Sequence, residues 1–140
     1  MSAAREVGRR PLTYLRAALA AIGTAVWLAR LERGNAFDQT VARLRAGRAF
    51  PQRLADPAVH ARVVNRLLPW LPPRGMGRCL KRSLLLLHLW SRCGLAPTLH
   101  LGFVGPVHGS VQGHAWLTAS SDRGPVTAGD DAGYTEAFVF

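Results

Sequence analysis

The sequence predicts an α+β fold, with N-terminal helices, a central helix carrying a cysteine, and a small antiparallel sheet. In the first half, apolar residues recur every three or four positions, which is typical of amphipathic helices. Residues 78–94 are apolar nearly all round, so this helix is expected in the middle of the molecule. From residue 97 onward the pattern alternates between turns rich in Gly and Pro, which is typical of strands. Helices followed by strands indicate α+β.

The composition indicates one folded domain. The chain has 140 residues, 49% of them hydrophobic, and a mean hydropathy of +0.07. This is enough apolar material for one core and too little length for two. Two cysteines do not form a disulfide framework, so a reducing, cytoplasmic location is expected.

Positive charge is concentrated in the first part of the chain. Residues 1–82 hold 16 of the 18 Lys and Arg residues and only four acidic residues. Such a surface could face nucleic acid, an anionic membrane or an acidic peptide. The arginines are scattered through helical patterns and no nucleic-acid signature occurs, so solvated helix faces are favoured and no nucleic-acid partner is predicted.

The first helical pattern covers residues 11–33 and ends at Gly34. Its twin arginine and apolar stretch superficially suggest an export signal, but only thirteen residues separate Arg16 from Arg30. That is below the ~18–20 residues of a membrane span, so no span is predicted. An amphipathic helix that docks on the domain is favoured, and loose attachment to a membrane surface stays open. Its helically spaced large apolar residues are Leu15, Leu19, Ile22 and Val26.

Two shorter helices and a loop precede the central helix. The first is expected to run from an Asn35 N-cap to Gly47 and to use Phe37, Val41 and Leu44. The second begins with the Asp56 cap and Pro57, and buries Val59, Val63 and Leu67. Three prolines and two glycines make residues 69–77 a loop. Strands are expected at residues 97–105, 109–120, 124–128 and 136–140, with turns at 105–109 and 120–124.

Cys79 lies in the first turn of the central helix. There the helix dipole and unpaired backbone N–H groups, together with Arg78, Lys81 and Arg82, favour a thiolate. The alternative is a small packed cysteine. Cys93 lies at the other end of the same helix, where the dipole opposes a thiolate, and is therefore expected to be structural.

His114 is the best-placed base for a thiolate nucleophile. Alternation puts His114 and Trp116 on one strand face, although a lone strand histidine is more often a packed residue. The competing histidines are His60, His88, His100 and His108. A cysteine at a helix start, a histidine in a strand and an aspartate after the next strand is the layout of a thiol catalytic triad.

The carboxylate of this set is assigned to Asp130, with Asp131 as the close alternative. Asp122 lies in the preceding turn and is expected to be a hairpin residue. No Cys or His pairs occur at metal-ligand spacing and there is no phosphate-binding glycine loop, so neither a metal nor another cofactor is predicted.

The stretch "CLKRSLLLLHLWSRCGLAPTLHLGFVG…GHAWLT…PVTAGDD…Y" resembles the lasso peptide biosynthesis proteases, a bacterial transglutaminase-like family. The resemblance covers about residues 76–134. It implies a transglutaminase-like fold, with a helical docking part at 1–70 and a catalytic core at 71–140. It also implies a leader peptidase in which Cys79 is the nucleophile, His114 the general base and Asp130 the orienting carboxylate.

The resemblance also implies the partners of the reaction. The substrate is the leader region of a precursor peptide, presented by a separate peptide-recognition protein because this chain resembles the stand-alone protease half. The ATP-dependent lasso cyclase is a further expected partner. Two departures are seen: Thr118 stands where the family carries an acidic residue, with a longer turn that blurs the position of the aspartate, and Cys93 intervenes in the arginine-glycine pair. A non-catalytic peptide-binding module and an acyl transferase are the rival functions.

Overall fold

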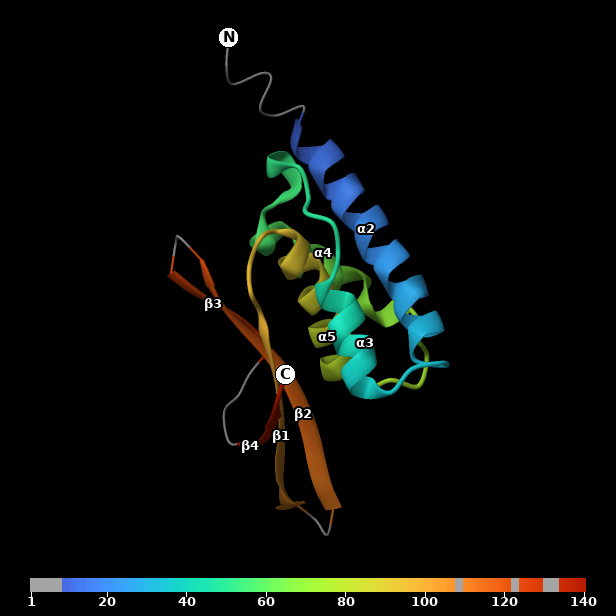
Figure 1. The fold of residues 1–140 in the computed structure, drawn as a ribbon, viewed down its shortest axis with the longest axis vertical. Helices are drawn as coiled ribbons and strands as arrows, with labels where there is room; N and C mark the ends of the chain where they lie inside the picture. The colour runs from blue at the N-terminus through green and yellow to red at the C-terminus, as the bar shows by residue number, and fades with distance from the viewer. Residues whose placement is uncertain (1–8, 108–109, 122–123, 130–133) are drawn as a thin grey trace.

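The computed structural model describes residues 9–107, 110–121, 124–129 and 134–140. Its helices come first and its strands last (Figure 1), so the predicted α+β fold class is confirmed. The helices are α2 (Arg9–Leu31), α3 (Phe37–Arg45), α4 (Pro57–Leu67) and α5 (Arg78–Arg92), with 3-10 turns η1 (Gln52–Leu54) and η2 (Leu68–Trp70). The strands are β1 (Thr98–Val107), β2 (Ser110–Ser121), β3 (Gly124–Ala128) and β4 (Thr135–Val139).

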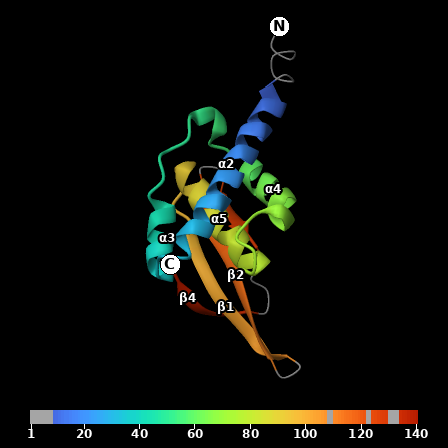
Figure 2. The same cartoon turned by 90° about the vertical axis from the view of Figure 1, so that its right-hand side faces the viewer.

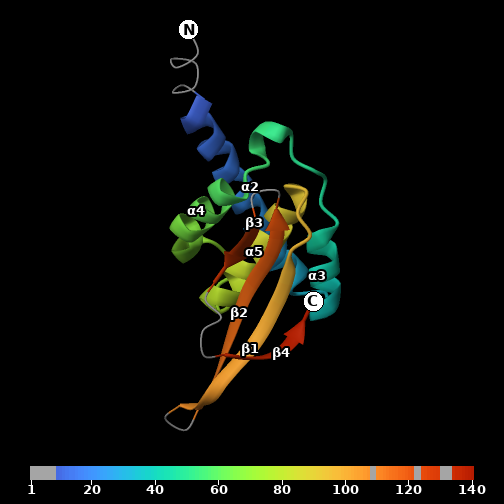
Figure 3. The same cartoon turned by 90° about the vertical axis from the view of Figure 1, so that its left-hand side faces the viewer.

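The strands form one antiparallel sheet in the order β3-β2-β1-β4. The helices lie on one side of it, and Figure 3 views the molecule from the sheet side. In the β1–β2 hairpin, Leu99 pairs with Leu117 and Gly102 with His114. Because side chains alternate along a strand, the leucines enter the core while His114 and Trp116 share the other face, as predicted.

Helix α5 is the centre of the packing. It contacts α2, α3 and α4 on one side and β1 and β2 on the other. Residues Leu84 to Trp90 are all buried, which agrees with the pattern that is apolar nearly all round. The helix ends where Gly94 takes a φ of +86°, a left-handed conformation that glycine adopts without strain.

The docking face of α2 differs from the prediction. Leu15, Leu19, Ile22 and Val26 do not dock; they are all exposed. The buried face instead carries small side chains at every fourth position, followed by two leucines: Ala17, Ala21, Ala25, Leu28 and Leu31. Alanines let the α2 backbone come close to α4 and α5, whereas bulky leucines would hold the helices apart. A pattern in which both faces are apolar does not reveal which one docks.

The caps of the shorter helices were partly predicted. The Asp56 carboxylate accepts a hydrogen bond from the Ala58 N–H (3.0 Å), which confirms the N-cap of α4. The N-cap of α3 is Ala36 rather than Asn35. The Asn35 side-chain amide instead donates to the Leu31 carbonyl (3.0 Å) and so closes the end of α2. Of the expected stripe of α4, Val63 is buried, while Val59 and Leu67 are half-buried.

Candidate active site

Cys79 is the second residue of α5, directly after the Gly77 N-cap and Arg78. The first hydrogen bond of the helix runs from the Lys81 N–H to the Gly77 carbonyl (2.9 Å), so the Cys79 N–H has no partner within the helix. The Cys79 side chain is half-buried and not in a disulfide. The thiol thus lies at the positive end of the helix dipole, beside an N–H group that the helix leaves free.

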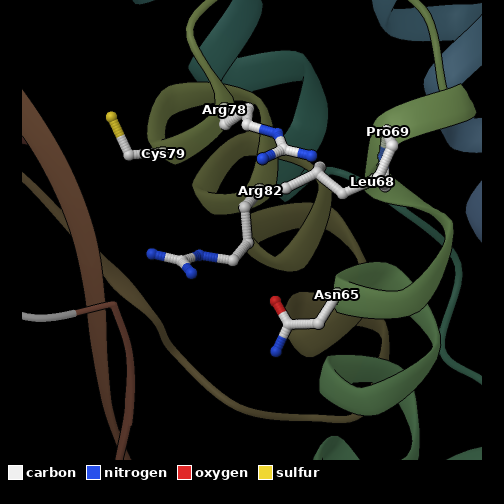
Figure 4. A pocket seen from close by; sticks show the side chains of 6 residues that line it. All are labelled: Asn65, Leu68, Pro69, Arg78, Cys79 and Arg82. Carbon is white, nitrogen blue, oxygen red and sulfur yellow. The ribbon is translucent and has the colours of Figure 1, made fainter.

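A pocket opens beside Cys79, with a volume of about 420 Å³. Figure 4 shows its lining, with Cys79 and the Arg82 side chain extending from α5 to the same side. Besides Cys79, the lining residues are Asn65, Leu68, Pro69, Arg78 and Arg82. Two arginines among the lining residues and the N-terminus of α5 give this pocket a positive character, which favours negatively charged groups.

Arg82 connects this pocket with the sheet. It stands three residues after Cys79 and therefore on the same side of α5. At Gly129, an added Cβ would lie 2.9 Å from the Trp116 Cβ and 3.1 Å from Arg82 Nη2. The first turns of α5 thus reach the end of β3, beside the β2 residue two positions from His114. Sequence reasoning gave Arg82 only a general charge effect, although its i, i+3 spacing from Cys79 was a usable signal.

His114 lies on β2, half-buried between two aromatic rings. Its ring stacks on Tyr134 with centroids 4.4 Å apart and on Trp116 at 5.9 Å. Its Nε2 is buried and has no hydrogen-bond partner among the described residues. The Arg82 Nε is in the same condition. Buried polar atoms are normally paired, so both atoms have the capacity to bind a group outside the described residues.

A second histidine network occupies the same face of the sheet, which the sequence did not reveal. The His100 ring meets a Glu136 carboxylate oxygen at 2.5 Å and the Thr118 hydroxyl at 2.7 Å, and it stacks on Trp116. Thr118, which departs from the motif of the resembled proteases, thus forms a side-chain hydrogen bond with the His100 ring. These residues meet through strand register, to which no local sequence signal points.

The structure does not connect all of the predicted catalytic residues by hydrogen bonds. No hydrogen bond links Cys79 to His114, both of which are described. Asp130, Asp131 and Asp122 lie outside the described residues, as does His108. The other two competing histidines are buried and hold backbone carbonyls. His60 Nε2 contacts the Leu54 carbonyl and His88 Nδ1 the Leu44 carbonyl, both at 2.7 Å. Burial is the main cause that lowers the pKa of both rings.

Cys93 has the character of a structural cysteine. Burial, followed by the charge of Asp56, raises the pKa of its thiol to about 12, against a smaller opposing effect of Arg92. Such a thiol stays protonated at neutral pH and is a poor nucleophile. Across the described ranges of the chain, no three His, Cys, Asp or Glu side chains are grouped so as to hold a metal ion.

A family comparison is consistent with this arrangement of a helix-start cysteine and a strand histidine. Residues 15–139 match the family model of the transglutaminase-like superfamily. The chain therefore belongs to this superfamily, which includes cysteine proteases and acyl transferases. Comparison with curated proteins and with solved structures finds no further match.

Proposed function

We propose that this protein is a cytoplasmic cysteine peptidase that removes the leader from a lasso peptide precursor. The observation that supports it most is the accessible thiol of Cys79 at a helix N-terminus, in a pocket with Arg78 and Arg82. Arg82, on the same side of α5, lies close to Gly129 and Trp116, beside the strand that holds His114, whose Nε2 has no hydrogen-bond partner among the described residues. This arrangement offers a nucleophile, an anion-stabilising environment and a proton carrier.

In the proposed reaction, the Cys79 thiolate attacks the carbonyl carbon at the leader–core junction. The negative oxygen that forms accepts a hydrogen bond from the Cys79 N–H, which has no partner in the helix. The C–N bond then breaks, His114 gives a proton to the departing core amine, and the leader remains as a thioester. Water, deprotonated by His114, attacks the thioester and releases the leader carboxylate and the Cys79 thiol.

His114 requires a group that orients its ring. Stacking on Tyr134 and Trp116 fixes the plane of the imidazole. We assign the orienting carboxylate to Asp130 because it directly follows Gly129 in the chain, and Arg82 lies close to Gly129. Comparing Asp130→Asn, Asp131→Asn and Asp122→Asn tests this assignment, since the true third residue shows the largest loss of turnover.

The leader is proposed to arrive on a separate recognition protein that docks on the basic helical part, with the lasso cyclase taking the freed core. The α4 arginines Arg62 and Arg66 are exposed and offer positive charge to an acidic partner surface, and Arg62 also donates to the Tyr14 hydroxyl (3.3 Å). Charge reversal at both positions is expected to weaken the complex with the recognition protein. Unchanged complex formation would contradict this docking surface.

Mass spectrometry of a candidate precursor, incubated with this protein and the recognition protein, tests the activity. We expect a free leader carboxylate and a free core amine. Cys79→Ala lowers turnover at least about a thousandfold because no other group replaces the nucleophile. Cys93→Ala is the matched control and retains turnover.

The products separate the rival functions. In water enriched in heavy oxygen, hydrolysis places one labelled oxygen in the leader carboxylate. An amide-linked leader without label would show an acyl transferase instead. Peptide binding with unchanged biological activity in Cys79→Ala would show a non-catalytic module.

A further inference from the structure

Helix α2 carries a row of large apolar side chains that nothing in the described structure covers. We call Leu12, Leu15, Leu19, Ile22 and Val26 the outer stripe. Their side chains are 40–61% exposed, whereas the alanines on the opposite face of the helix are almost completely buried. Over residues 12–26 the large aliphatic side chains are thus outside and the alanines at 17, 21 and 25 inside, the reverse of a helix that only packs on its own core.

The outer stripe is continuous and faces away from the sheet. Its members alternate in steps of three and four residues, so they lie along one side of the helix over roughly 20 Å. Figures 1 and 2 show α2 as the outermost helix on the side opposite the strands. An apolar strip of this length on a surface is normally an interaction site.

Positive charges surround the outer stripe. Residues 9–31 contain four arginines and no acidic residue. Arg16 and Arg30 are exposed, and just beyond the helix Arg33 is exposed beside Glu32, whose charge it balances. Arg62 of α4 lies beside α2 and donates to the Tyr14 hydroxyl (3.3 Å). Leucines bordered by arginines are the pattern of a helix that lies in the headgroup layer of an anionic bilayer.

We propose that the outer stripe of α2 attaches this protein to an anionic lipid surface. The apolar side chains enter the layer between headgroups and acyl chains, and the flanking guanidinium groups bind lipid phosphates. The proposal does not depend on the proposed peptidase activity. It leaves the Cys79 pocket and the sheet outside the lipid layer.

Other arrangements of α2 fit the observations less well. Pro11–Leu31 is long and apolar enough to cross a membrane by length and composition. The count of thirteen residues between Arg16 and Arg30 thus underestimated the length of helix that could span a membrane. A span would nevertheless require the buried alanine face to leave α4 and α5. Pairing of two copies through the stripe would bring together chains of net charge +10, with Arg16 and Arg30 next to the contact.

Sedimentation of the full chain with lipid vesicles tests the proposal. We expect binding to vesicles of phosphatidylcholine mixed with phosphatidylglycerol and little binding to phosphatidylcholine alone. Added salt weakens the electrostatic part of the binding. Leu15→Gln/Leu19→Gln lowers the partition coefficient at least about tenfold. Arg16→Gln and Arg30→Gln each lower it about fivefold on anionic vesicles.

A matched control changes exposed apolar residues elsewhere. Phe103→Gln/Phe138→Gln alters the sheet, where both rings are exposed, and is expected to leave binding unchanged. Circular dichroism and thermal unfolding show that each variant folds. The proposal is wrong if the wild type does not bind anionic vesicles, or if both double variants lose binding equally. It is also wrong if Leu15→Gln/Leu19→Gln leaves vesicle binding intact and only breaks a dimer or a complex with another protein.

Discussion

The two ends of α5 carry the two cysteines of the chain in opposite environments. Cys79 lies at the N-terminal end and lines a pocket together with Arg78 and Arg82. Cys93 is the C-cap, and its thiol has a pKa raised to about 12, chiefly by burial. A larger hollow, of about 890 Å³, lies at the Cys93 end. Pocket volume therefore does not distinguish the two thiols; the direction of the helix and the charged residues at each end of it do.

Thiol alkylation should show the largest difference between these ends. Iodoacetamide requires a thiolate, and a thiol of pKa about 12 is almost entirely protonated near neutral pH. In the folded protein we expect Cys79 to react on the order of a thousandfold faster than Cys93. Peptide mass spectrometry after timed quenching measures both rates. Unfolding in urea is the control, since it should make the two rates similar, and equal rates in the folded state would refute the contrast.

The contact of the N-terminal end of α5 with the sheet can be broken at Gly129. Gly129 has a φ of +104°, and a Cβ there would press on Trp116, Arg82 and the Ala115 carbonyl. Gly124 has nearly the same φ, +105°, with nothing within 4 Å of the added atom. We expect Gly129→Ala to lower the free energy of unfolding by about 1–3 kcal/mol more than Gly124→Ala. Urea unfolding of both variants measures this, and equal losses would show that the contact does not matter.

The two buried histidines of the helical part should make the stability of the protein depend on pH. Burial lowers the pKa of His60 and His88 below the ordinary 6.5. Above pH 6.5 both rings are neutral in either state; below it the unfolded chain binds protons that the folded chain does not. The free energy of unfolding therefore falls as pH drops, by at most about 1.4 kcal/mol per pH unit for each ring. Urea unfolding from pH 7 to about pH 5 checks this. His88→Gln should flatten the slope, and an unchanged slope would contradict the assignment.

The smallest effect is expected from Asp56, whose charge contributes to the raised pKa of Cys93. Asp56→Asn keeps a side-chain oxygen for the Ala58 N–H and removes the negative charge. We expect a severalfold faster alkylation of Cys93 and an unchanged rate at Cys79. Asp56→Ala is the control for the cap, since it should also cost about 1 kcal/mol of stability. A slower reaction of Cys93 in Asp56→Asn would reverse the expected sign.

The sequence was most informative where a local pattern has a single structural solution. The Asp56 cap, the limits of α5 and the β1–β2 hairpin follow from caps, periodicity and alternation, and the structure agrees. The prediction of which face of α2 docks was wrong. Alanines and leucines are both apolar, and the distance between the packed helices decides which of them is buried. The meeting of Arg82 with Gly129, and of His100 with Glu136, depends on the register of distant segments. No local sequence pattern predicts either contact.

Lys81 links helix α5 to the segment that leads to it, next to the Cys79 pocket. Its ammonium group is buried and donates to the carbonyls of Leu71 (2.7 Å) and Pro73 (3.5 Å), in the segment that leads to α5. The first turn of α5 therefore carries Cys79 and also holds the preceding segment in place through Lys81. The segment that follows the pocket residues Leu68 and Pro69 is tied to the helix that carries Cys79, so the Lys81 ammonium group joins two sides of the pocket.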